Sequence, residues 1–142
     1  MSDKPKSVVK EVAVFSIGMG VLLTVAAYFA FTGLDASAPP LWGMQRNLAI
    51  GLPVALLAVA NIGSGIMLIV QRNSGAVTLS VFSGCAISLF YFYFMMSTTG
   101  TVGINLITFI MLALPLLLLS RGKMATDEIK AEAEAMTQVS AE

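Results

Sequence analysis

Four stretches without a charged residue constrain this chain most strongly. Each is long enough to cross a bilayer, because about 20 helical residues span the roughly 30 Å hydrocarbon core. They are continuously apolar and do not alternate, which favours helices over a β-barrel. Their approximate bounds are residues 12–31, 48–70, 76–96 and 102–119. The sequence therefore predicts an all-α integral membrane protein with four transmembrane helices in an antiparallel bundle.

The composition agrees with a membrane protein. Hydrophobic residues make up 57% of the 142-residue chain and charged residues 11%, whereas about a quarter of the residues in soluble domains are charged. The four segments occupy more than half of the chain, which leaves no room for a folded soluble domain. We expect one four-helix transmembrane domain, residues 1–123, followed by a tail, residues 124–142.

Basic residues at the helix ends predict the orientation, because connections rich in Lys and Arg stay in the cytoplasm. One side has only Arg46, and the other has Lys4, Lys6, Lys10, Arg72, Arg121 and Lys123. We therefore expect an integral protein of the cytoplasmic (inner) membrane of a bacterium, with both termini in the cytoplasm. In the outer loop, residues 32–46, Trp42 is expected at the headgroup level as an interface anchor.

Missing residue types exclude several classes of function. No Asp, Glu, Lys, Arg or His lies inside the four segments, and the whole chain has no His and one Cys, Cys85. Proton relays, voltage sensors and ion-coupled transporters use intramembrane ionisable groups. Ser-His-Asp hydrolases, His-ligated cofactors and Cys-pair redox sites need residues that are absent. We predict a protein that is not an enzyme, without catalytic residues, metal ligands, a cofactor or a nucleic-acid partner.

Small residues recur on single faces of the expected helices. Such rows let helix backbones approach closely, which drives association where lipid removes the hydrophobic effect. The longest row lies in the third segment, with a member every four residues. The expected helix–helix interface comprises Ser16, Gly20, Ala60, Ser64, Ala76, Ser80, Gly84 and Ser88. Through these rows we expect contact with other membrane protein subunits or with a second copy of the chain.

Among the polar side chains inside the expected helices, the candidate intramembrane polar sites are Asn61, Asn105 and Thr108. An unpaired amide is costly in hydrocarbon, so we expect the two Asn residues to bond between helices. Alternatively, neutral polar groups such as Asn61, Ser64 and Thr78 line the pore of a homo-oligomeric channel. Such a pore is weakly selective or gated by dewetting.

Five consecutive aromatic residues, which we call the aromatic collar, stand near the end of the third segment: Phe90, Tyr91, Phe92, Tyr93 and Phe94. At about 100° per residue, their rings point all around a helix. Tyr91 needs an acceptor inside the protein, and Asn105 and Thr108 are the candidates. The collar either fills the bundle and its interfacial belt, or lines an outer-leaflet cleft for lipid, a quinone-like molecule or a carotenoid-like molecule.

The tail is acidic, with five acids and one base in residues 124–142. Thr126, followed by two acids, predicts a helix start, because a hydroxyl caps free amides and acids complement the helix dipole. Ile129, Ala133 and Met136 then share one face, giving an amphipathic helix. This tail is either a solvated extension or a docking segment for a basic cytoplasmic partner. The main functional prediction is an accessory or structural subunit of a larger membrane complex, surrounded by membrane lipid.

Overall fold

The computed structural model describes residues 7–34 and 37–141. Across these residues the chain forms four helices, α1 (Val8–Gly33), α2 (Arg46–Gln71), α3 (Ser74–Thr99) and α4 (Leu106–Ala141). All four are long and apolar enough to cross a membrane. The predicted all-helical membrane class and its four candidate spans are therefore confirmed.

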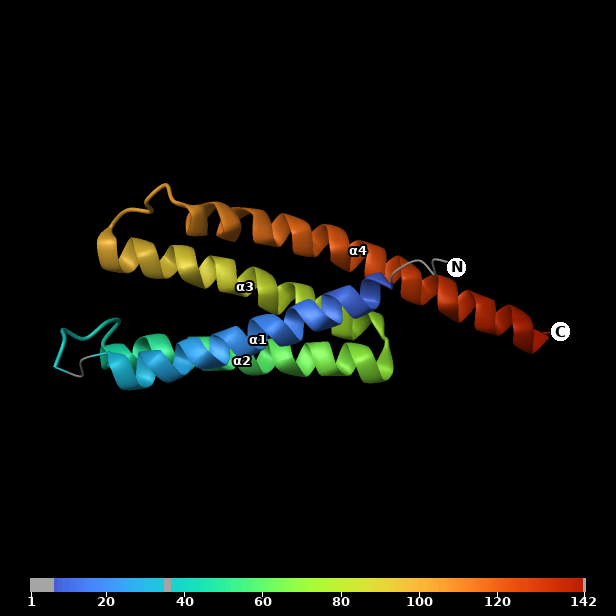
Figure 1. Cartoon of the computed structure of the whole chain (residues 1–142), viewed down its shortest axis with the longest axis horizontal. Helices are drawn as coiled ribbons and strands as arrows, with labels where there is room; N and C mark the ends of the chain where they lie inside the picture. The colour runs from blue at the N-terminus through green and yellow to red at the C-terminus, as the bar shows by residue number, and fades with distance from the viewer. Residues whose placement is uncertain (1–6, 35–36, 142) are drawn as a thin grey trace, which may run out of the picture.

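The helices are arranged as two hairpins, α1 with α2 and α3 with α4 (Figure 1). The start of α1, the α2–α3 connection and the C-terminal part of α4 lie at one end, which we call the tail end. The α1–α2 and α3–α4 connections lie at the opposite end, the loop end. The hairpins stand apart toward the loop end and come together toward the tail end, where α1 reaches α4.

The main apolar core lies toward the tail end. All four helices contribute to it, so packing in this region joins the two hairpins. Its fully buried members are Val9, Val12, Ala13, Leu68, Ala76, Val77 and Ala125. Three of the seven are alanines, which shows that the helices meet here with little side-chain volume between them.

Short polar signals set the ends of α2 and α3. Arg72 ends α2 in the left-handed conformation, with φ of 45°. Asn73 follows directly and begins α3, because its Oδ1 accepts a hydrogen bond from the Ala76 amide at 2.7 Å. The α2–α3 connection therefore consists of only Arg72 and Asn73. At its other end, α3 ends at Gly100, whose φ of 70° is a conformation that glycine adopts without steric cost.

The start of α4 differs from the prediction. The expected segment begins at residue 102, but the helix begins at Leu106. Asn105 acts as its N-cap, since its Oδ1 lies 2.9 Å from the Thr108 amide nitrogen and 3.2 Å from the Thr108 hydroxyl. A run of uncharged residues identifies a span but does not reveal such a cap inside the run.

The end of α4 also differs from the prediction, because the helix continues from the membrane segment into the tail without a break. Thr126 does not begin a new helix, and its hydroxyl instead donates to the Gly122 carbonyl oxygen one turn back, at 3.0 Å. Arg121 and Lys123 end the uncharged run but are good helix formers, so they do not end the helix. The domain boundary expected after residue 123 lies inside α4.

Candidate functional site

Two glycines bring the backbones of α1 and α2 close together. A Cβ atom added to Gly20 would lie 2.5 Å from Ile62 Cγ1 and 2.9 Å from the Ala58 carbonyl oxygen. In the same way, a Cβ atom added to Gly65 would lie 2.8 Å from the Ala13 carbonyl oxygen. Since these distances are too short for real contacts, the backbones are as close as glycine allows.

The small residues along this contact, which we call the α1–α2 seam, repeat every seven residues. All of them are buried: Ala13, Gly20, Ala27, Gly51, Ala58 and Gly65. The row predicted from a spacing of four includes Gly20 and the buried Ser16 and Ser64, but it also names Ala60, which is partly exposed. A seven-residue repeat of small residues in both segments is the sequence signal that identifies the other five.

The row predicted on α3 is buried throughout, at Ala76, Ser80, Gly84 and Ser88. Gly84 packs directly against Leu118 of α4. The hydroxyls of Ser16 and Ser80 share a hydrogen bond between α1 and α3. Apart from the partly exposed Ala60, these rows are therefore buried within the chain's own bundle.

Polar groups inside the helices find partners close to them. Asn61 is buried, and its Nδ2 donates to the Leu57 carbonyl oxygen of its own helix at 2.8 Å. The expected bond from Asn61 to another helix is thus replaced by a bond within α2. Asn105 lies outside the helix as its cap. The Tyr91 hydroxyl lies 3.2 Å from Thr108 Oγ1, which confirms one of its two expected partners.

The groups proposed to line a pore are bonded in the same local way. Ser64 is buried and donates to the Asn61 carbonyl oxygen at 3.1 Å, and Thr78 is exposed and donates to the Ser74 carbonyl oxygen at 3.0 Å. Because backbone carbonyls one turn away satisfy these donors, the chain provides them with partners without a water-filled path.

Trp42 contacts the aromatic collar at the loop end. Its ring stacks on Tyr93, with centroids 5.1 Å apart and planes at 23°, and meets Phe90 edge-on at 6.5 Å. Phe90 in turn stacks on Phe94 at 6.3 Å. The side of α3 that carries these rings is thus covered in part by the α1–α2 loop, which supports the interpretation of the collar as packing material.

Trp42 reaches the collar from a tight turn. Leu41 and Met44 exchange two backbone hydrogen bonds of 2.9 and 3.0 Å, and the two residues between them have positive φ, 54° at Trp42 and 77° at Gly43. A bulky residue in this conformation costs roughly 1–3 kcal/mol. Aromatic pairs return about 0.5–1.5 kcal/mol each beyond their burial. The strain is therefore compensated by the contact of Trp42 with α3.

At the tail end one carboxylate joins three separate parts of the chain. Glu128 Oε2 accepts hydrogen bonds from the amide nitrogens of Val8, at 2.8 Å, and Val9, at 3.3 Å. Its Oε1 accepts from the Ser7 hydroxyl and from Arg72 Nη2, the latter at 3.2 Å. We call these five residues the Glu128 clamp.

The clamp supplies the N-terminal cap of α1. The first amides of a helix have no partner inside it and carry partial positive charge. Ser7 occupies the N-cap position, but among the described residues its hydroxyl makes no capping bond to α1 and donates to Glu128 instead. A carboxylate of α4 therefore neutralises the start of α1, which fixes the two helices relative to each other.

The charge state of Glu128 follows from these contacts. Burial raises the pKa of the Glu128 carboxyl, but hydrogen bonds from Ser7, Val9 and Val8 and the Arg72 charge lower it by more. The net result is a pKa below the ordinary value of glutamate. Glu128 is consequently ionised at neutral pH, as the cap and the ion pair require.

The clamp also fixes the direction in which α4 leaves the bundle. Arg72 Nη2 makes a second ion pair with Glu132 Oε1 at 2.7 Å, one turn beyond Glu128. Before this point, Gly122 and Ala125 are buried and Ile129 packs against the core. Beyond it, α4 projects from the bundle as a helix (Figure 1).

The face of α4 that packs on the bundle continues into the projecting part. Buried or partly buried positions at spacings of three and four, namely 118, 122, 125 and 129, lead on to Ala133, Met136 and Ser140. These three residues, which we call the projecting stripe, are exposed, and Met136 exposes 67% of its surface. The stripe thus has the spacing of a packed face but no bundle beneath it.

Within the described residues, no three His, Cys, Asp or Glu side chains are grouped so that they could hold a metal ion. In comparisons with known proteins, no family model, no curated protein and no solved structure matches the chain. The fold itself defines the class, a small helical membrane protein.

Proposed function

We propose that the protein is a non-enzymatic accessory subunit of a larger complex in the cytoplasmic membrane of a bacterium. Its helices cross the membrane as an antiparallel bundle, with the tail end in the cytoplasm. Support for this orientation comes from the basic residues among those described: Lys10, Arg72, Arg121 and Lys123 lie toward the tail end, and Arg46 lies at the loop end. In this orientation α4 carries the projecting stripe into the cytoplasm.

The projecting stripe is the observation that carries the proposal. Up to Ile129, this face of α4 packs on the chain's own helices, and from Ala133 onward the same spacing continues without a cover. A helix that presents a row of small and apolar residues on one side is a typical element for packing against a partner helix. Because the Glu128 clamp holds α4 in place, a partner meets a preformed helix, and less ordering entropy is lost on binding.

Charge indicates the chemistry of the partner. The described part of α4 after Thr126 carries four acids and one base: Asp127, Glu128, Glu132, Glu134 and Lys130. Arg72 pairs with Glu128 and Glu132, and the four acids still exceed these two bases. Anionic lipid repels such a segment, whereas basic side chains attract it. The proposed partner is therefore a basic helical segment of another membrane subunit, located at the cytoplasmic surface.

The test uses two matched substitutions on the projecting part of α4. Met136→Lys places a charge in the stripe, and Gln138→Lys places the same charge on an exposed position of the opposite face. Each variant is extracted from its native membrane in lipid-preserving discs, and the mass of the intact assembly is measured by native mass spectrometry. We expect an unrelated chain at fixed ratio with the wild type and with Gln138→Lys, and its loss with Met136→Lys.

Two results contradict the proposal. A wild-type preparation that contains only copies of this chain removes the accessory role and makes ion or solute flux in vesicles the next measurement. Equal retention of the unrelated chain by both variants shows that the assembly forms without the projecting stripe.

A further inference from the structure

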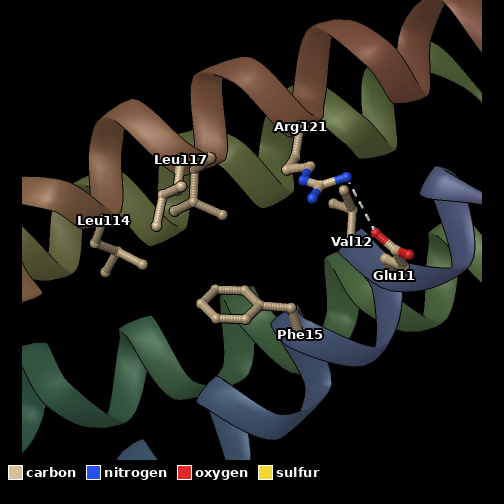
Figure 2. A pocket seen from close by; sticks show the side chains of 7 residues that line it. Glu11, Val12, Phe15, Leu114, Leu117 and Arg121 are labelled. Carbon is tan, nitrogen blue, oxygen red and sulfur yellow. Dashed lines mark ion pairs between the residues drawn. The ribbon is translucent and has the colours of Figure 1, made fainter.

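A groove runs between α1 and α4 at the level where the two hairpins begin to separate. It has a volume of about 310 Å³ and is lined by seven residues, Glu11, Val12, Phe15, Leu114, Leu117, Leu118 and Arg121. Figure 2 shows the Phe15 ring from α1 and the Leu114 and Leu117 side chains from α4 directed toward the space between the helices. Val12, Leu114 and Leu118 are buried, whereas Phe15 and Leu117 are 40% and 61% exposed. The groove is thus apolar and open at its side.

One end of the groove is charged. Arg121 Nη1 lies 3.4 Å from Glu11 Oε2 across the gap between the helices (Figure 2). Both side chains are about half exposed, 52% for Arg121 and 44% for Glu11. An ion pair this exposed contributes little stability, so the guanidinium can exchange its partner at small cost.

The charge around this pair is positive overall. Lys10 directly precedes Glu11 and is exposed, whereas Lys123 lines the separate groove between α3 and α4. Lys10 and Arg121 thus give two positive charges against the single negative charge of Glu11 at this end of the groove. A guanidinium binds phosphate oxygens in a bidentate manner, which makes Arg121 the group best suited to hold a phosphate at the mouth of the groove.

We propose that this groove binds an anionic phospholipid, with one acyl chain between α1 and α4 and its phosphate at Arg121. The apolar walls lie within the segments that face hydrocarbon, and the charged mouth lies where those segments end. A volume of about 310 Å³ is at the lower end of the range for small-molecule sites, roughly 300–1,000 Å³. The site goes beyond the proposed docking function, because none of its residues belongs to the projecting stripe.

The test compares two lipids with the same acyl chains, phosphatidylglycerol and phosphatidylcholine. Each lipid is titrated into the purified full-length protein, and native mass spectrometry measures how many lipid molecules are bound. We expect preferential binding of phosphatidylglycerol. Arg121→Gln should weaken that binding about fivefold, since one basic group near anionic lipid contributes about 1 kcal/mol. The matched control, Arg46→Gln at the loop end, should leave it unchanged.

Two more variants separate binding from folding. Leu117→Trp fills the groove and should reduce the binding of both lipids, whereas Leu116→Trp, at the neighbouring exposed position outside the lining, should not. Glu11→Gln removes the competing carboxylate and should strengthen phosphatidylglycerol binding, a gain that a misfolded protein cannot show. Equal binding of the two lipids, or equal effects of the two tryptophan variants, overturns the proposal.

Discussion

The Glu128 carboxylate lies 2.8 Å from the Val8 amide nitrogen, although 120 residues separate the two along the chain. Through this contact the last helix caps the first. Arg72, between the second and third helices, binds the same carboxylate. One side chain therefore holds together the start of α1, the α2–α3 connection and the exit of α4.

The clamp predicts a specific loss of stability in Glu128→Gln. The amide keeps an acceptor for α1 but removes the charge that both the helix start and Arg72 require. Hydrogen bonds to charged groups contribute about 1.5–3 kcal/mol, so we expect the free energy of unfolding to fall by roughly that amount. Unfolding in mild detergent, followed by circular dichroism, measures it. Asp127→Asn makes the same charge change at an exposed position and should stay within about 0.5 kcal/mol of the wild type.

The same carboxylate predicts a dependence on pH. The folded-state pKa of Glu128 lies below its ordinary value, which is about 4.3 for glutamate. Its contribution to stability is therefore complete above that value and is lost as the pH falls through the lower, folded-state pKa. We expect the difference in melting temperature between wild type and Glu128→Gln to be constant from neutral pH to about pH 5 and to shrink below about pH 4. An unchanged difference at acidic pH would show that the charge of Glu128 does not stabilise the fold.

The α1–α2 seam predicts which glycines tolerate a methyl group. Gly20→Ala and Gly65→Ala force backbones apart and should destabilise the protein by about 1–3 kcal/mol, as overpacking does. Gly18 and Gly63 have no atom of the described residues within 4 Å of an added Cβ. Alanine there should be neutral or stabilising by up to about 1 kcal/mol, because it favours helix. Equal effects at all four positions, measured by denaturant titration in micelles, would contradict the close approach of α1 and α2.

Trp42 provides a spectroscopic test of the loop contact, since it is the only tryptophan of the chain. Removing its stacked neighbour with Tyr93→Leu should shift its emission and increase quenching by acrylamide. Tyr28→Leu is the matched control, because that ring pairs with Phe29 of its own helix. A spectrum that responds equally to both changes would place Trp42 away from the collar.

The sequence was sufficient to predict features that depend on local composition. The length and apolarity of the four segments set the helix positions within a few residues for the first three helices. Tyr91 and Thr108 could be paired because they lie 17 residues apart in consecutive helices. Such contacts follow from helix order alone.

The Glu128 clamp could not be predicted in this way, because its partners lie in parts of the chain that only the fold brings together. In the sequence, Glu128 is one of several similar acids in a tail that is predicted to be solvated or to dock on a partner. The α1–α2 seam was missed for another reason. Its repeat of seven is visible in the sequence, but a spacing of four predicts Gly20 without Gly65.

The cap of α1 forms late in synthesis, because it requires a residue of the last helix. Chains are synthesised from the N-terminus, so α1 is complete long before residue 128 leaves the ribosome. Until then its first amides lack the carboxylate that satisfies them in the finished protein. The N-terminal end of α1 thus acquires its cap only after the fourth helix has been synthesised, and a chain truncated before Glu128 lacks this cap.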